Sequence, residues 1–216
     1  MSDAVWHSVD AYFEDRLVGK DNALSLAISD STEAGLPAIA VSASQGKMLH
    51  LMALSIGAKR ILEVGTLGGY SAIWLGRALP ADGGLVSLEI DPRNAEVAMR
   101  NVARAGLAEK VEIVVGPALQ SLPHLAGPFD FTFIDADKES NAAYFDHAVQ
   151  LSRPGAIIIV DNVVREGHVV DPNGNAQVQG VRRMMDAIHT DTRVSATAVQ
   201  TVGVKGYDGF LMAVVR

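Results

Sequence analysis

From residue 60 onward, short apolar runs alternate with longer amphipathic segments. The apolar runs have the length and branched-chain content of buried strands, whereas the segments between them repeat apolar residues at helical spacing. Because this order is typical of strand–helix–strand crossover units, it predicts a parallel sheet with helices on both faces. We predict strands at residues 61–64, 85–89, 111–115, 129–134 and 156–160, and helices at residues 71–79, 92–105 and 141–151.

The first third of the chain precedes this alternation and has a helical pattern of its own. Apolar residues recur at helical spacing in residues 4–18 and again in residues 45–56. We expect both helices to turn these stripes toward the core. A chain of 216 residues, 49% apolar and 20% charged, has the size and balance of one domain. We divide residues 1–216 into an N-terminal helical cap at 1–58 and a core at 59–216.

The C-terminal segment departs from the parallel pattern. Residues 194–202 and 210–215 have strand-like sequences, and a glycine-containing turn around residues 203–209 separates them, which predicts an antiparallel pair. The fold class that we predict is therefore α/β: a Rossmann-like doubly wound sheet, mostly parallel, with an antiparallel C-terminal strand pair and added N-terminal helices.

Charge and composition restrict the partners. The formal net charge of −7 disfavours nucleic acid and anionic membrane surfaces, which favours small molecules. The chain contains no cysteine, so disulfides and thiolate metal sites are excluded. The N-terminal segment has four acidic residues and no signal-peptide pattern, and no apolar run reaches the roughly 18 to 20 residues of a membrane span. We expect a cytoplasmic protein.

Three glycines follow the first predicted strand in the stretch ILEVGTLGGYS, residues 61–71. A phosphate-binding Walker loop would place lysine and a hydroxyl residue after the last glycine, whereas Tyr70 and Ser71 follow here. The spacing also differs from the G-x-G-x-x-G of dinucleotide folds. The loop by itself is compatible with a simple strand-to-helix turn.

Acidic residues near the ends of the first two strands narrow the choice of ligand. Glu89 is the kind of residue that binds both hydroxyls of a ribose, as in NAD or S-adenosylmethionine. Glu63, just before the glycines, would lie close to phosphate oxygens but suits a cationic group. Glu63 therefore favours S-adenosylmethionine, which has an amino group and a sulfonium and no phosphate.

Further polar residues follow the fourth and fifth strands. Asp135 and Lys138 come after residues 129–134, and Asp161 and Asn162 come after residues 156–160. Because the carboxyl ends of parallel strands lie at one edge, we expect these side chains to be close together. Two carboxylates and an amide oxygen are hard ligands that suit Mg²⁺, Ca²⁺ or Mn²⁺. Taken singly, each residue is also compatible with a helix cap or a solvated surface.

Several longer segments together resemble a known family. Besides the glycine loop, they are LEIDP, VVGPAL, FDFTFIDADKESNAAYF and GAIIIVDNVVREG, within residues 35–216. They are similar to the cation-dependent O-methyltransferases, which include caffeoyl-coenzyme A O-methyltransferase and its bacterial relatives and, more distantly, catechol O-methyltransferase. The resemblance implies methyl transfer from S-adenosylmethionine to a phenol with adjacent hydroxyls, with Mg²⁺ as the expected cation, in a homodimer.

The resemblance also implies a role for individual residues. Asp135, Asp161 and Asn162 correspond to metal ligands, and Lys138 to a proposed general base. The cofactor-binding positions are Val41, Glu63, Gly65, Thr66, Ser71, Glu89, Ala118 and Asp135. Asn141 and Glu166 differ from the tyrosine and asparagine of plant members, which counts against a coenzyme A ester as substrate.

Two other classes of function remain open on the sequence. A nicotinamide-dependent oxidoreductase would bind reduced NAD and would not bind S-adenosylhomocysteine. A non-catalytic S-adenosylmethionine-binding module would bind the cofactor without metal-dependent turnover. Retention of Lys138 and of all three metal-ligand positions favours the enzyme over the module.

Overall fold

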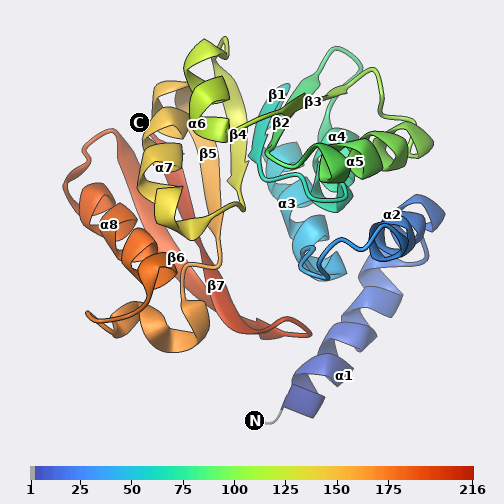
Figure 1. The fold of residues 1–216 in the computed structure, drawn as a ribbon, viewed down its shortest axis with the longest axis horizontal. Coiled ribbons are helices and arrows are strands. Elements are labelled where there is room, and N and C mark those ends of the chain that lie inside the picture. Colours follow the sequence, from blue (N-terminus) through green and yellow to red (C-terminus); the bar gives the residue numbers. More distant parts are fainter. Residues whose placement is uncertain (1–2) are drawn as a thin grey trace.

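The computed structural model describes residues 3–216, and one mixed sheet organises them (Figure 1). Its order is β3-β2-β1-β4-β5-β7-β6. The first five strands pair in parallel, and β7 is antiparallel to both β5 and β6. The predicted fold class is therefore confirmed. The strands are β1 Arg60–Val64, β2 Gly84–Glu89, β3 Val111–Val115, β4 Phe129–Ile134, β5 Ser152–Asp161, β6 Val194–Gly203 and β7 Gly206–Val215.

Helices cover both faces of the sheet and enclose two apolar clusters. One cluster lies between the sheet and α2 to α5, and the other lies between the sheet and α7 and α8. The central strands β1 and β4 bury almost all of their side chains, as expected for a sheet covered on both sides, whereas the edge strands β3 and β6 bury only one residue each. The longer helices are α1 Asp3–Phe13, α2 Asn22–Glu33, α3 Ala43–Ser55, α4 Tyr70–Ala78, α5 Pro92–Arg104, α7 Asn141–Gln150 and α8 Ala176–Thr190.

Shorter helical turns connect these elements. They are η1 Glu14–Val18, α6 Ala118–Ser121, η2 Leu122–His124, η3 Lys138–Ser140 and η4 Arg165–Val170. The strand order reverses between β1 and β4, and both strands end at the same edge. A ligand cleft is expected beyond this edge, because the connections from the two strands diverge there to opposite faces.

The prediction that the stripe in residues 4–18 faces the core is wrong. No residue of α1 is buried, its residues Val5, Val9, Tyr12 and Phe13 are between 44% and 55% exposed, and Leu17 of the following η1 turn is 66% exposed. Figure 1 shows that α1 extends away from the body of the sheet, and the strand that it contacts is β6, near the tip of the β6–β7 hairpin. The stripe in residues 45–56 does face the core, where α3 buries Leu49 and Ala53.

Other boundaries differ from the sequence-based prediction. Helices α2 and α8 were not predicted, and β5 begins at Ser152, four residues before the predicted start. The C-terminal turn is shorter than residues 203–209, since β6 and β7 pair as far as Gly203 and Gly206. The backbone N–H of Val204 in this turn donates to Asp10 of α1. Among residues 3–216, no helix is both long and apolar enough to cross a membrane.

Candidate active site

A cleft of about 910 Å³ opens at the carboxyl ends of β1, β2 and β4. It brings together residues that are far apart in the sequence, from Ser31 of α2 to Gln177 of α8. Two of the predicted site residues are not on its surface: Glu63 is buried under it, and Asp161 lies on a neighbouring cavity. The predicted residues that line it are Val41, Gly65, Thr66, Ser71, Glu89, Ala118, Asp135, Lys138 and Asn162.

The glycine loop after β1 is shaped by close backbone contacts. Gly65 has a φ of 99°, and a Cβ there would lie 2.1 Å from the carbonyl oxygen of Asp135. Gly69 is left-handed and caps α4, with Ala98 of α5 directly against it. Because only glycine fits these two positions, the chain can turn tightly and present the N-terminus of α4 to the cleft.

Glu89, at the end of β2, holds this loop in place. One carboxylate oxygen accepts hydrogen bonds from the backbone N–H groups of Thr66 and Leu67, at 3.2 and 2.7 Å. The other accepts from the N–H of Asp91 at 2.9 Å and from the Asn94 amide at 3.3 Å. A carboxylate has about four acceptor sites, so Glu89 is fully paired. A ribose hydroxyl would have to displace one of these donors, and the long Asn94 contact is the weakest.

Glu63, one strand away, is paired much less completely. Its side chain is fully buried; Ser87 donates to one oxygen at 2.5 Å, and Oε1 has no hydrogen-bond partner. Burial raises the pKa of Glu63 to about 7, the nearby hydroxyls of Ser71 and Ser87 oppose this, and the charges of Asp135 and Glu89 add a smaller increase. A buried carboxylate oxygen without a donor is costly, so this position favours a ligand that brings a cationic N–H group.

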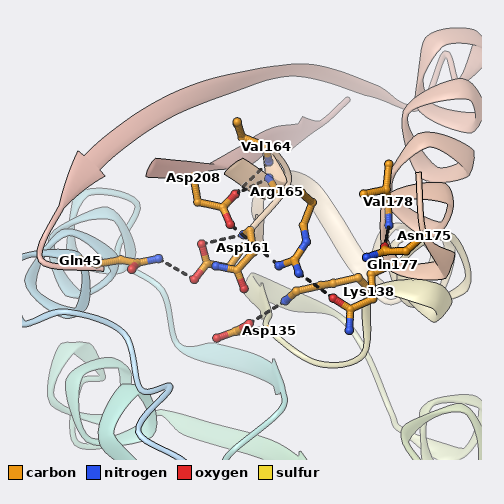
Figure 2. A network of polar contacts seen from close by, with 11 residues as sticks. Gln45, Asp135, Lys138, Asp161, Val164, Arg165, Asn175, Gln177, Val178 and Asp208 are labelled. Carbon is orange, nitrogen blue, oxygen red and sulfur yellow. Dashed lines mark hydrogen bonds and ion pairs between the residues drawn. The ribbon is translucent and has the colours of Figure 1, made fainter. Parts of the chain in front are cut away.

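Asp135, Lys138 and Asp161 converge at the ends of β4 and β5 (Figure 2). The Lys138 ammonium donates to Asp135 Oδ1 at 2.7 Å, and η3 keeps the lysine side chain buried. Asp161 is also buried, and Asn162 follows it with a left-handed φ of 56°. Burial and the charge of Asp135 raise the pKa of Asp161 to about 7, although Lys138 opposes this. The negative charge is therefore incompletely balanced by protein groups.

This arrangement fits a divalent cation by its donor chemistry. The carboxylate oxygens of Asp135 and Asp161 and the side-chain amide oxygen of Asn162 are of the type that binds Mg²⁺, Ca²⁺ or Mn²⁺. Within residues 3–216, no three histidine, aspartate or glutamate side chains gather at one point. Any cation at this site would therefore depend on the Asn162 amide and on open positions for water or substrate.

A second cavity of about 260 Å³ lies beside Asp161 and Asn162. Gln45 and Met48 of α3, Asp10 of α1 and the tip of the β6–β7 hairpin line it. No sequence motif marks these residues, so they were not predicted to belong to the site. Asn162 lines both cavities and therefore marks where they meet.

The loop after Asn162 is held by the hairpin. Asp208 of β7 accepts hydrogen bonds from the N–H groups of Val164 and Arg165, both at 2.9 Å (Figure 2). Arg165 and Glu166 have left-handed φ angles near 56°, a conformation that is unusual for these residue types. Asp208 stabilises this strained turn, which places Arg165 on the cleft and leaves Glu166 exposed.

The two departures from the plant pattern lie outside both cavities. Glu166 points to solvent, and Asn141 is buried at the start of α7 without a hydrogen-bond partner for its amide. Neither residue is part of the lining of the cleft or of the second cavity. Their effect on substrate choice stays a prediction.

Fold and site together define a doubly wound α/β protein with a ligand cleft at the reversal of strand order. A sequence model of the family described as O-methyltransferase matches residues 20–213. A catechol O-methyltransferase of Mycobacterium tuberculosis is 53% identical, covering 96% of this chain and 95% of the relative. The chain therefore belongs to the O-methyltransferase family, which confirms the resemblance in its sequence, and it is a methyltransferase enzyme.

Solved structures agree with this assignment. The O-methyltransferase from Bacillus cereus, solved in complex with SAH, is 50% identical with a TM-score of 0.98, and the match covers 100% of both chains. The O-methyltransferase TomG from Streptomyces achromogenes, solved in complex with SAM, is 52% identical with a TM-score of 0.97, covering 100% of this chain and 99% of that one.

Proposed function

We propose that the protein transfers a methyl group from S-adenosylmethionine to one hydroxyl of a vicinal-diol phenol, with the help of a divalent cation. The choice of S-adenosylmethionine as the cofactor rests on the buried Oε1 of Glu63, which has no hydrogen-bond partner. An amino group of the cofactor would supply the missing donor and the missing positive charge. The two similar proteins that were solved with SAH and SAM support the same ligand.

Different residues of the cleft bind different parts of S-adenosylmethionine. Gly65, Thr66 and Ser71 surround the methionine part, and Val41 closes this end of the cleft. Glu89 receives the ribose hydroxyls, and Ala118 lies beside the adenine. Glu63 thus serves the cationic amino group of the cofactor, and Glu89 serves its hydroxyl groups.

The cation site takes Asp135, Asp161 and Asn162 as its protein ligands, with Mg²⁺ as the expected ion. When bound, the cation supplies positive charge that favours the ionised form of an adjacent hydroxyl, and S-adenosylmethionine supplies an electrophilic methyl group on sulfur. Asp135 belongs to both sites, because it directly follows β4, lines the cofactor cleft and lies close enough to Asp161 to raise its pKa.

Lys138 acts on the proton of the acceptor. Its Nζ is buried on the cleft and is oriented by Asp135, so a neutral amine there would accept the proton of a substrate hydroxyl. The other contribution of the protein is to orient the two substrates, because methyl transfer requires the acceptor oxygen to lie in line with the sulfur–methyl bond that breaks. The buried walls of β1 and β4 exclude water from this point.

The second cavity supports a small acceptor. Its volume of about 260 Å³ is below the 300 to 1,000 Å³ that is typical of pockets for drug-sized ligands. It adjoins Asp161 and Asn162, where two adjacent hydroxyls would meet the cation. We therefore rank a single-ring catechol above a caffeoyl ester or a flavonoid as the acceptor.

A direct test uses labelled S-adenosylmethionine with catechol, caffeoyl-coenzyme A and a flavonoid, in Mg²⁺ and in excess chelator. We expect Mg²⁺-dependent methylation that is fastest with catechol. Undiminished turnover in chelator would overturn the role of the cation, and turnover with caffeoyl-coenzyme A alone would overturn the choice of acceptor. Calorimetry with S-adenosylhomocysteine and reduced NAD separates the cofactors, and tight NAD binding alone would overturn the methyl donor.

A homodimer is supported by the exposed apolar surface of the N-terminal helices. Phe13 and Leu17 line an apolar groove together with Leu51 of α3, and Val5, Val9 and Tyr12 on the same stripe of α1 are exposed. A lone helix of 11 residues is marginal in water, so a second copy that covers both stripe and groove would stabilise it. Light scattering should give a dimer for the wild type and for Val170→Asp, and a monomer for Leu17→Asp; a monomeric wild type would overturn this.

No other macromolecular partner is expected. The net charge of −7 supports the exclusion of nucleic acid and of anionic membrane surfaces. A cytoplasmic location stays a prediction, which cell fractionation would test.

A further inference from the structure

Gln45 forms a hydrogen bond with Asp161 that has no role in the reaction described above. Its Nε2 donates to Asp161 Oδ2 at 2.7 Å, across 116 positions of the sequence. Figure 2 shows Gln45 reaching from α3 toward the end of β5. The other oxygen of Asp161 accepts from the Asn162 backbone N–H at 2.9 Å. Each carboxylate oxygen therefore has one donor and retains one free acceptor site.

The local sequence offers Gln45 a different partner. Ser42 caps α3 and accepts from the N–H of Gln45 at 3.1 Å, so the stretch Ser42–Gln45 has the S-x-x-Q spacing of a capping box. In that motif the glutamine side chain returns to the backbone N–H of the cap residue. Among the described residues, Gln45 makes no such bond and its amide is directed to Asp161 instead. The tertiary contact has displaced the local one.

We propose that Gln45 is a positioning residue that fixes the Asp161 carboxylate in the orientation needed to bind the divalent cation. The inference rests on the proposed function, because it assigns Asp161 to the cation. The donated hydrogen bond selects one rotamer of a carboxylate that otherwise has only an adjacent backbone donor. It also keeps Oδ2 from turning toward the ammonium of Lys138, which Asp135 already occupies. Such partners of metal-binding carboxylates typically change metal affinity by 10- to 100-fold when removed.

The role of Gln45 also links the two parts of the chain. Helix α3 belongs to the N-terminal segment, and Asp161 ends a central strand of the sheet. Gln45 and Asp161 line the second cavity together, so the donor lies on the side from which the acceptor enters. The glutamine thus orients Asp161 without occupying the cleft that receives the cofactor, because Gln45 is not part of that lining.

The test measures Mg²⁺ and Mn²⁺ affinity by calorimetry in the whole enzyme with S-adenosylhomocysteine bound. Gln45→Met keeps the length of the side chain and removes the donor. We expect metal affinity to fall 10- to 100-fold, while the Kd of S-adenosylhomocysteine measured without metal stays within about twofold. Gln45→Asn, which is one methylene shorter, should lose metal affinity in the same way and guards against a folding defect that is peculiar to methionine.

The chain offers a matched control. Gln150 of α7 donates to Asp146 at 2.6 Å on the surface, which is the same pairing of amide and carboxylate outside the site. Gln150→Met should leave metal affinity unchanged. Folded Gln45 variants with wild-type metal affinity would overturn the inference alone. A wild type that binds S-adenosylhomocysteine but no divalent metal would overturn the proposed cation role, and the inference with it.

Discussion

The two halves of the site prepare their carboxylates in different ways. At the ends of β1 and β2, Glu63 and Glu89 are neighbours across the sheet, yet Glu89 is fully paired with N–H groups and Glu63 keeps an oxygen without a partner. At the ends of β4 and β5, Lys138 donates to Asp135 and Gln45 donates to Asp161, so that each carboxylate has its own side-chain donor but only one lysine lies near the two of them. The first half lacks a donor group, and the second half lacks positive charge.

This difference indicates what each half is suited to bind. A ligand with an amino group and hydroxyls completes the first half, because hydrogen-bond donors are what Glu63 lacks. A small cation completes the second half, where protein donors already hold the carboxylates but do not neutralise them. The following experiments alter one half at a time and ask whether the other half is affected.

The largest effect is expected from Asp161→Asn. The substitution keeps the shape of the side chain but removes the charge that the cation requires, so turnover should fall by about a thousandfold, roughly 4 kcal/mol. Since burial raises the pKa of Asp161, a neutral amide should not destabilise the fold. Initial rates and melting temperatures check both points. Asp82→Asn, in an exposed ion pair with Lys59, is the control, and normal turnover of Asp161→Asn would contradict the cation site.

A pH effect on stability should come from the other half. Because the pKa of Glu63 is about 7 in the folded protein and near 4.5 in the unfolded chain, the folded state retains a proton that the unfolded state releases. Stability of the ligand-free protein should therefore fall as pH rises from 4.5 to 7, by about 3 kcal/mol from this residue. Urea unfolding should show a smaller pH dependence for Glu63→Gln. Identical pH profiles would contradict the raised pKa.

Substitutions of Lys138, which lies between the two halves, test its role in proton transfer. Both Lys138→Arg and Lys138→Ala should lose at least about a hundredfold in turnover, because arginine stays charged and alanine has no base. The loss should shrink at alkaline pH, where hydroxide replaces the missing base. Rates against pH at saturating Mg²⁺ measure this, with Lys59→Arg as the surface control. Near-wild-type rates for Lys138→Arg would make Lys138 an electrostatic anchor.

The smallest effect is expected for Glu89→Ala. The substitution removes a charged acceptor for the ribose and also loosens the glycine loop, so S-adenosylhomocysteine binding should weaken by about 1.5 to 3 kcal/mol. Calorimetry with the cofactor product and, separately, with Mg²⁺ measures both halves. Metal affinity should stay unchanged, since Glu89 is not among the cation ligands. A parallel loss of metal affinity would show that the two halves are coupled.

Sequence alone determined the sheet and the edge at which the site forms. Strand and helix periodicity reflects burial on two faces, and it placed β1 to β5 close to their observed positions. Residues at the ends of these strands or directly after them, such as Glu63, Glu89 and Asp135, had to lie near one another because parallel strands end together. The glycines after β1 likewise predicted a tight turn, and the structure shows that the backbone accepts no other residue at Gly65.

Only the tertiary structure decided the direction of α1 and the partner of Gln45. An apolar stripe such as that of α1 indicates that one face of a helix is suited to burial, but it does not identify the surface that buries it. In this structure the rest of the chain leaves the stripe exposed. The spacing of Ser42 and Gln45 predicts a local cap, yet the amide bonds to Asp161, which only folding brings near. Periodicity encodes local geometry, whereas contacts across 116 residues depend on how the layers pack.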